Sequence, residues 1–355
     1  MHASDSFALP TFSRILIFRL SAIGDCVHGL PVACALRDHD STLDIGWVVE
    51  GRTAEILRGH RAIDKVICIP RGWYKSWATM SEARQAVREF APDITIDLQG
   101  LTKSAALAAC SGAKTRLGFS GQEGRELSSW FNNLRMAASA THVVDKNLEL
   151  LTMLGVVPQA ARFDLPIDAA SAEKTRAWTQ EQRLPSGYAI LNPGAGWASK
   201  RWPVERFAAV AAGLQDRFGL RSVVTWAPGE ERNWADQIVS QANGAAVLAP
   251  PTTLVELTAL CRGAKIFVSG DTGPLHLAAA VGTPCVALFG ASDAQRNGPY
   301  GHQHRALQPV QLVGSSRMRR TADNTAVSVI TVKGVLSAAG EILRGLPREE
   351  TRHAA

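Results

Sequence analysis

The chain has 355 residues, of which 46% are hydrophobic and 20% charged, and its formal net charge is +6 at pH 7. These proportions exclude collagen, coiled coils and low-complexity polymers, and the length predicts about two domains. The positive charge indicates an anionic partner, which is a nucleotide, a membrane surface or a nucleic acid. Most of the excess lies between Gly51 and Arg125, where 12 Lys and Arg residues stand against 7 Asp and Glu.

Membrane-spanning and secretory segments are not expected. No apolar run reaches the roughly 18 residues that a transmembrane helix needs. The N-terminal stretch carries Asp5 and lacks the long apolar centre of a secretory signal. The cysteines show neither paired nor metal-ligand spacing, which predicts reduced, mostly buried thiols and no metal site. They stand at Cys26, Cys34, Cys68, Cys110, Cys261 and Cys285. The sequence thus predicts a cytoplasmic protein.

The first half of the chain alternates short apolar runs with helical segments. Strands are predicted at residues 14–20, 45–50, 65–70, 94–99 and 115–119, and helices at about 25–37, 81–90 and 104–110. Continuous apolar strands separated by helices are typical of a parallel sheet that is covered on both faces.

The same alternation restarts after a connecting segment at 163–187, which contains a polar helical piece. Strands are predicted at 188–194, 222–228, 246–250, 265–270 and 285–290. Helices are predicted at 204–218, 231–242, 254–261, 274–281 and 332–344, the last capped by Thr331. The pattern predicts two Rossmann-like α/β domains, residues 1–166 and 167–355, and leaves open that the last helix packs back on the first. Ligands are expected in a central cleft, at the carboxyl ends of the strands.

The turn after the strand at 265–270 is the strongest candidate for a phosphate site. It reads Asp271-Thr272-Gly273, with Pro274 where the first position of a helix is expected. The N–H groups of a helix N-terminus bind anions, and Thr272 and Gly273 add hydroxyl and amide donors. Asp271 is expected to bind sugar hydroxyls or backbone N–H groups. His276 is interpreted as a further ligand contact, the alternative being a packing histidine.

A second glycine-containing turn, Gly194-Ala195-Gly196, follows the strand at 188–194. It matches a dinucleotide-binding fingerprint poorly because Ser199 stands in place of the third glycine, which argues against an NAD-dependent dehydrogenase. The preferred interpretation is a loop whose amides, with Lys200 or Arg201, bind phosphate.

The first strand is followed by a turn that ends in Gly24-Asp25. Asp25 stands at the start of a predicted helix, where an N-capping aspartate is common. The functional alternative is a general base that accepts a proton from an acceptor hydroxyl. The residues alone leave the two interpretations equal.

Four segments together resemble glycosyltransferase family 9, the heptosyltransferases of lipopolysaccharide inner-core synthesis. They read SAIGDCVHGLP, DLQGLTKSAAL, NPGAGWASKRWP and SGDTGPLHLAAAVGTP, and the resemblance extends from about residue 14 to 343. The segments at 97–107, 124–133 and 142–151 are most similar to the heptosyltransferase I branch of that family.

The resemblance implies a GT-B fold and an inverting, metal-independent transfer of heptose from ADP-heptose to Kdo of lipid A, without a cofactor. It implies Asp25 as general base, and donor contacts by Gly194, Gly196, Lys200, Asp271, Thr272, Gly273 and His276. A donor-binding glutamate falls on Glu230 or Glu231, with Glu230 preferred. Acceptor contacts are expected from Arg58, Arg61, Lys103 and Arg125, on a protein that touches the cytoplasmic face of the inner membrane.

Three alternatives stay open. In the first, the donor is another nucleotide sugar, and in the second, the acceptor is another glycan. In the third, the chain is a non-catalytic sugar-nucleotide-binding protein in which Asp25 only caps its helix. A nucleic-acid partner is not expected, because the basic residues are not interleaved with aromatic ones.

Overall fold

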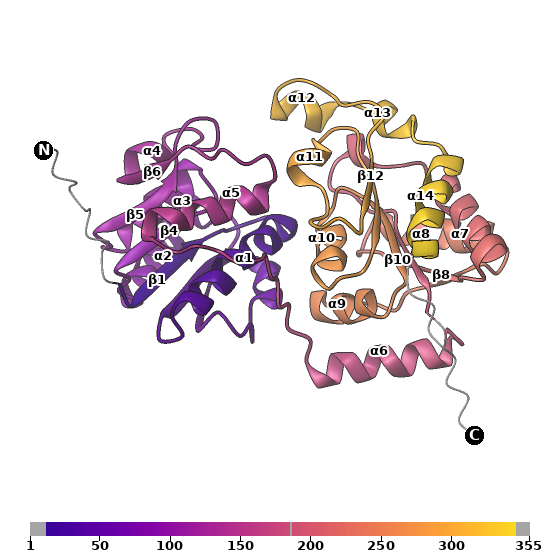
Figure 1. Cartoon of the computed structure of the whole chain (residues 1–355), viewed down its shortest axis with the longest axis horizontal. Coiled ribbons are helices and arrows are strands. Elements are labelled where there is room, and N and C mark those ends of the chain that lie inside the picture. Colours follow the sequence, from indigo (N-terminus) through magenta and orange to yellow (C-terminus); the bar gives the residue numbers. More distant parts are fainter. Residues whose placement is uncertain (1–11, 185–186, 346–355) are drawn as a thin grey trace, which may run out of the picture. The chain divides into compact units, whose positions relative to one another are not determined.

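The computed structural model describes residues 12–184 and 187–345. The chain divides into two compact units, Met1–Pro166 and Ile167–Ala355 (Figure 1). Each unit is a parallel α/β sheet with helices on its faces, as the alternation of short apolar strands and helices predicts.

The first unit contains a six-stranded sheet in the order β3-β2-β1-β4-β5-β6. Its strands are β1 (Arg14–Phe18), β2 (Asp44–Glu50), β3 (Lys65–Ile69), β4 (Ile94–Asp97), β5 (Thr115–Phe119) and β6 (Leu134–Met136). Its helices are α1 (Ile23–His39), η1 (Gly51–Ile56), η2 (Trp73–Lys75), α2 (Trp77–Glu89), α3 (Thr102–Cys110), α4 (Ser128–Phe131), α5 (Val143–Glu149) and η3 (Leu150–Leu154). The chain reverses its direction of winding between β1 and β4, so this is the unit's topological switch point.

The second unit repeats this plan with the order β12-β11-β10-β7-β8-β9. Its strands are β7 (Ala189–Asn192), β8 (Ser222–Val224), β9 (Ala246–Leu248), β10 (Ile266–Gly270), β11 (Cys285–Leu288) and β12 (Arg305–Leu307). Its helices are α6 (Ala169–Glu181), η4 (Ala198–Lys200), α7 (Val204–Phe218), α8 (Glu230–Gln241), α9 (Leu254–Arg262), α10 (Gly273–Ala280), α11 (Ala294–Asn297), α12 (Ser316–Thr321), α13 (Thr325–Ser328) and α14 (Val332–Gly345). Here the switch point lies between β7 and β10.

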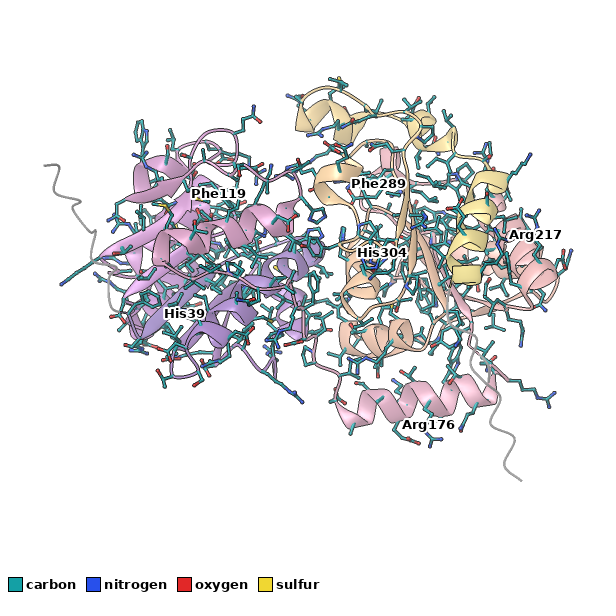
Figure 2. All side chains as sticks on the ribbon, in the orientation of Figure 1. His39, Phe119, Arg176, Arg217, Phe289 and His304 are labelled. Atoms are coloured by element: carbon teal, nitrogen blue, oxygen red, sulfur yellow. The ribbon has the colours of Figure 1, made fainter. Side chains whose placement is uncertain are left out.

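Apolar side chains from the strands and the covering helices form the cores. In the first unit Leu16 and Phe18 of β1 pack with Val87 of α2 and Leu107 of α3. In the second unit Phe289 and His304 lie among the strands, whereas Arg217 of α7 points outward (Figure 2). Burial of these apolar side chains is the main term that stabilises each unit.

The last helix, α14, belongs to the second unit. Its side chains at Val335, Leu336 and Ile342 are buried in the core that also contains Leu214 of α7. Thr331 caps it as predicted, accepting a 3.1 Å hydrogen bond from the Gly334 N–H. The apolar side of this helix is therefore buried within the second unit.

None of the helices in the described part of the chain combines the length and the apolar character that a membrane span requires.

Candidate functional site

An ion pair between Lys200 and Asp271 lies at the switch point of the second unit. Lys200 ends the short helix η4 after β7, and Asp271 follows β10, the strand hydrogen-bonded to β7. The Lys200 Nζ lies 2.5 Å from the Asp271 Oδ2. Gly270 permits this approach, because a Cβ there would lie 2.9 Å from the Lys200 carbonyl oxygen. The two predicted donor residues therefore meet where open α/β sheets bind ligands.

The carboxylate of Asp271 is held by side chains on three sides. Ser292 Oγ donates to Oδ2 over 2.5 Å, and His276 Nε2 lies 3.3 Å from Oδ1. Burial raises the pKa of Asp271, but the hydrogen bond from His276 and the charge of Lys200 outweigh it and bring the pKa well below its ordinary value. Asp271 is thus ionised, and side chains hold its carboxylate where the sequence suggested sugar hydroxyls or backbone N–H groups.

This depressed pKa predicts an acid-dependent loss of stability. A carboxylate whose pKa falls on folding stabilises the protein above its unfolded pKa of about 4, and that contribution is lost as the pH falls below it. We expect Asp271→Asn to lower the urea midpoint at pH 7 and the difference from wild type to shrink toward pH 3. Urea titrations across this range test it, and a difference that stays constant with pH contradicts it.

A polar network joins the two turns behind this pair. Asn192 Nδ2 donates to Ser269 Oγ over 3.0 Å and lies 3.4 Å from Thr272 Oγ1. Thr272 caps α10, its hydroxyl accepting from the Leu275 N–H over 3.4 Å. Gly273 is the first residue of that helix. The network holds the N-terminus of α10 against the β7 loop, and with it the turn that the sequence assigns to phosphate.

Trp197 lies between two cations beside the same loop. The Lys200 Nζ lies 4.3 Å and the Arg320 guanidinium carbon 5.0 Å from its ring centre. Ser199 ties η4 to α12, because its Oγ donates to the Arg319 carbonyl over 2.7 Å. Sequence reasoning missed Arg320 and Ser292, since both come from segments far along the chain that carry no turn motif.

The structure distinguishes the two candidate glutamates. The Glu231 carboxylate lies against Gly194, where a Cβ would come within 2.2 Å of its Oε2, and it accepts a 2.9 Å hydrogen bond from the Ala227 N–H. Glu230, preferred from the sequence, is largely exposed and lies 3.8 Å from the Arg201 guanidinium. Glu231 is therefore the glutamate that the fold brings to the loop. Gly196 lies exposed on this loop, with open space where a Cβ would be.

In the first unit, Asp25 lies on the first turn of α1 and pairs with a buried arginine. Its Oδ1 lies 2.5 Å from Arg19 Nη2, and its Oδ2 accepts from the Ala22 N–H over 3.2 Å. The Asp25 side chain is 41% exposed, whereas that of Arg19 is buried. The N-cap of α1 is Ala22, so the interpretation of Asp25 as the N-capping residue is wrong: Asp25 is the third residue of the helix and bonds back to the N-cap N–H. Its carboxylate is open to solvent.

Asp97, at the carboxyl end of β4, organises the backbone around that pair. Its Oδ1 accepts from the Gln99 and Gly100 N–H groups over 3.1 and 3.2 Å. The Gln99 Oε1 in turn accepts from the Leu20 N–H over 3.0 Å, and the Leu98 carbonyl accepts from Arg19. The turns after β1 and β4 are therefore linked through one buried carboxylate.

We expect Asp97→Ala and Asp97→Asn to differ sharply in stability. Alanine leaves two buried N–H groups without an acceptor, at about 1–3 kcal/mol each. Asparagine keeps that acceptor, and its amide can donate to Asn132, whose Oδ1 has no hydrogen-bond partner in the structure. Burial also raises the pKa of Asp97, so the neutral side chain avoids a desolvation penalty. Equal losses of thermal stability in the two variants contradict this.

The predicted acceptor cations separate into two places. Lys103 pairs with the buried Glu50 over 2.8 Å, and Arg125 donates to the Gln99 carbonyl over 3.0 Å, both at the carboxyl edge of the sheet near Asp25. Arg58 and Arg61 lie in the return segment at 57–64, which leads to the amino end of β3. Along this segment Arg61 lies nearer than Arg58 to the start of β3.

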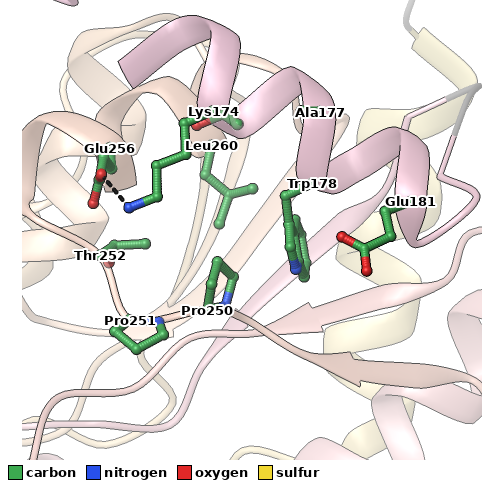
Figure 3. Close-up of a pocket in the computed structure, with 10 residues that line it drawn as sticks. Lys174, Ala177, Trp178, Glu181, Pro250, Pro251, Thr252, Glu256 and Leu260 are labelled. Atoms are coloured by element: carbon green, nitrogen blue, oxygen red, sulfur yellow. Dashed lines mark hydrogen bonds and ion pairs between the residues drawn. The ribbon is translucent and has the colours of Figure 1, made fainter. Parts of the chain in front are cut away.

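A hollow of about 310 Å³ lies beneath α6 (Figure 3). Trp178 points from α6 toward Pro250, and the Lys174–Glu256 ion pair borders the hollow. None of the predicted donor residues lines it. Within the described ranges, no three His, Cys, Asp or Glu side chains gather in a way that suits a metal ion.

Residues 80–325 match the family model described as glycosyltransferase family 9 (heptosyltransferase). Lipopolysaccharide heptosyltransferase 1 of Pseudomonas aeruginosa is 29% identical over 297 residues, covering 81% of this chain and 81% of that protein. A crystal structure of a family 9 glycosyl transferase from Veillonella parvula superposes with a TM-score of 0.81 at 24% identity, covering 94% and 97% of the two chains. E. coli heptosyltransferase WaaC with ADP-2-deoxy-2-fluoro heptose gives 0.72 at 28% identity, covering 92% and 99%. The predicted pairing of two parallel α/β sheets, as in GT-B enzymes, is confirmed.

Proposed function

Because the chain belongs to glycosyltransferase family 9, we propose that it transfers heptose from ADP-heptose to the Kdo region of the lipopolysaccharide inner core. The observation that carries the donor assignment is the convergence of the Lys200 ammonium and the α10 N-terminus at the switch point of the second sheet. The name of the P. aeruginosa relative supports the acceptor class, and the ligand of the E. coli structure supports the donor.

On the donor side, the second unit binds the diphosphate. Lys200 exchanges part of its pairing with Asp271 for phosphate oxygens, and the α10 N-terminus adds backbone N–H donors. His276 and Ser292 keep Asp271 in place while this happens. Negative charge grows on the departing diphosphate, so these groups stabilise the transition state more than the bound substrate.

On the acceptor side, Asp25 is the general base of an inverting displacement. The acceptor hydroxyl gives its proton to the Asp25 carboxylate, and its oxygen forms a bond to the anomeric carbon. The bond from that carbon to the phosphate oxygen breaks, and ADP leaves with the electron pair. Arg19, whose Nη2 lies 2.5 Å from the carboxylate, holds Asp25 in its orientation.

The reaction is proposed to need no metal ion and no cofactor, since Lys200 and the helix N-terminus supply the positive charge. The acceptor is anchored in a bilayer by its acyl chains, so the protein is proposed to work in peripheral contact with the cytoplasmic face of the inner membrane.

The test is ADP release from ADP-heptose with Kdo-lipid A, measured with and without EDTA. We expect turnover that EDTA leaves unchanged, and a product of inverted anomeric configuration. Turnover with a UDP- or GDP-sugar but none with ADP-heptose contradicts the assignment of ADP-heptose as the donor. Binding of ADP-heptose without turnover on any acceptor favours the non-catalytic alternative.

Glu231, in place of the Glu230 preferred from the sequence, is proposed to accept a hydrogen bond from a hydroxyl group of ADP-heptose. A hydrogen bond to a charged group contributes about 1.5–3 kcal/mol, so Glu231→Gln is expected to raise the KM for ADP-heptose by about 10-fold or more. Glu230→Gln, on the next residue and exposed, is the matched control and should change KM less than about threefold. If steady-state kinetics show a larger rise in the KM for ADP-heptose in Glu230→Gln than in Glu231→Gln, the contact with the donor belongs to Glu230.

A further inference from the structure

Large apolar side chains are exposed along one edge of the first unit. Trp77 is 83% and Trp130 79% exposed, and Tyr74 and Leu127 are each about half-exposed. All four follow the carboxyl ends of strands, Tyr74 and Trp77 after β3 and Leu127 and Trp130 after β5. We name these four residues the aromatic rim. Exposed apolar groups gathered in this way mark interaction surfaces.

The half of the rim after β3 is built outward from the core. Gly72, with a φ of +73°, turns the chain into η2, where Trp73 is buried. The Tyr74 ring packs edge-on to Trp73 at 5.9 Å, and the Lys103 Nζ lies 5.6 Å from its centre. Thr79 Oγ1 ties α2 back to the Trp73 carbonyl over 2.7 Å. The exposed aromatic side chains therefore project from an ordered turn.

The half after β5 is joined to the same neighbour, α3. The Leu127 N–H donates to Thr102 Oγ1 over 3.2 Å, and the Thr102 N–H donates to the Glu126 carboxylate over 3.0 Å. Glu126 holds a φ of +55°, which is uncommon for a residue other than glycine. Because α3 packs against both α2 and α4, the two halves of the rim both border the start of α3, where Thr102 and Lys103 lie.

The charges around the rim are sorted by sign. Exposed cations border it at Arg71, Lys75, Arg125 and Arg135. The acidic side chains nearby are bonded to protein groups: Glu50 pairs with Lys103, Glu123 with Lys146, and Glu126 accepts from the Thr102 N–H. The rim thus presents Trp and Tyr to solvent within a border in which Arg and Lys outnumber the exposed carboxylates of Glu82 and Glu126.

We propose that the aromatic rim inserts into the interfacial region of an anionic lipid bilayer. Trp and Tyr are the side chains enriched at membrane interfaces, and Lys and Arg beside them are attracted to anionic headgroups. The rim lies next to Lys103 and Arg125 at the edge that carries Asp25, so its insertion brings that edge to a lipid-anchored acceptor. This inference rests on the proposed function for its purpose, and on exposure, packing and charge for its location.

The test is binding of the full chain to vesicles of phosphatidylethanolamine and phosphatidylglycerol, without substrate. We expect co-sedimentation, and quenching of tryptophan emission by brominated lipid. The double variant Trp77→Gln/Trp130→Gln should weaken binding by about tenfold or more. Arg71→Gln and Lys75→Gln should each weaken it by about fivefold at low salt. Val157→Gln and Val313→Gln are matched controls, since Val157 is 76% and Val313 86% exposed, and should bind as wild type.

Unchanged vesicle binding in the double variant overturns the proposal, and so does capture of a protein partner through the rim with no affinity for lipid. Should the double variant lose its native circular dichroism, the single variants Trp77→Gln and Trp130→Gln replace it. Vesicle binding equal to that of wild type in both single variants also overturns the proposal. Turnover on a water-soluble, deacylated acceptor separates the two claims. Its absence in wild type counts against the proposed function only, whereas its retention in the double variant with loss of vesicle binding supports the rim.

Discussion

Replacing Asp25 with asparagine is expected to lower kcat by about 10²- to 10⁴-fold, the usual contribution of a general base. Asparagine keeps an oxygen for the Ala22 N–H but cannot take the proton of the acceptor hydroxyl. It also removes the carboxylate that pairs with the buried Arg19 guanidinium, so a loss of stability is expected beside the loss of turnover. Initial rates of ADP release, measured beside calorimetric binding of ADP, test this.

The control for Asp25 is a carboxylate with a purely local role. Asp168 caps α6, and its Oδ1 accepts from the Ser171 N–H over 2.7 Å. Asp168→Ala should therefore lower thermal stability and leave turnover unchanged, whereas Asp25→Asn should lose turnover and keep ADP binding. Full activity in Asp25→Asn reduces Asp25 to a residue of the helix N-terminus. If Asp25→Asn loses ADP binding to the same extent as turnover, the assignment of Asp25 as the general base is contradicted as well.

Replacing Lys200 with methionine is expected to lower kcat/KM for the donor by about 10²- to 10³-fold, as loss of a group that stabilises developing charge does elsewhere. The same change leaves the buried Asp271 carboxylate without its cation, so the protein is also destabilised. A loss of activity in this single variant therefore has two causes, one in the transition state and one in the fold.

The double variant Lys200→Met/Asp271→Asn separates these causes. It removes both charges, so its urea midpoint should return toward wild type while donor use stays low. If the double variant recovers donor use together with stability, Lys200 serves only to neutralise Asp271. Arg201→Gln gives the comparison for charge at the next residue. Arg201 stacks on Trp234 at 4.7 Å and pairs with Glu230. Arg201→Gln should therefore lower kcat/KM for the donor by less than about tenfold.

Local sequence determined much of the secondary structure. The helix predicted at 204–218 is α7 without change, and the strand at 115–119 is β5. Gly282 terminates α10 with a φ of +84°, as its position after the apolar run predicts. The segments without a prediction, such as β6 and β12, are three residues long, and strands of that length carry too little periodicity to be recognised.

The turns that are predicted to bind the donor carry glycine, proline and capping residues at fixed offsets from an apolar strand. Thr272 caps α10 as a threonine in that position does, and the helix begins at Gly273. Such signals depend on neighbours within about one turn, so the chain carries them in its local order. Asp25 lies on the first turn of α1, which begins at Ile23, two residues before the predicted start.

What only the tertiary structure decided is which of these residues meet. Lys200 and Asp271 are 71 positions apart and come together because β7 and β10 are neighbours at the switch point. The fold likewise brings Glu231, and not the exposed Glu230, against Gly194. Strand order and register set these contacts, and both arise from packing across the whole sheet. The local sequence thus determined which chemical groups each turn carries, and the sheet determined their partners.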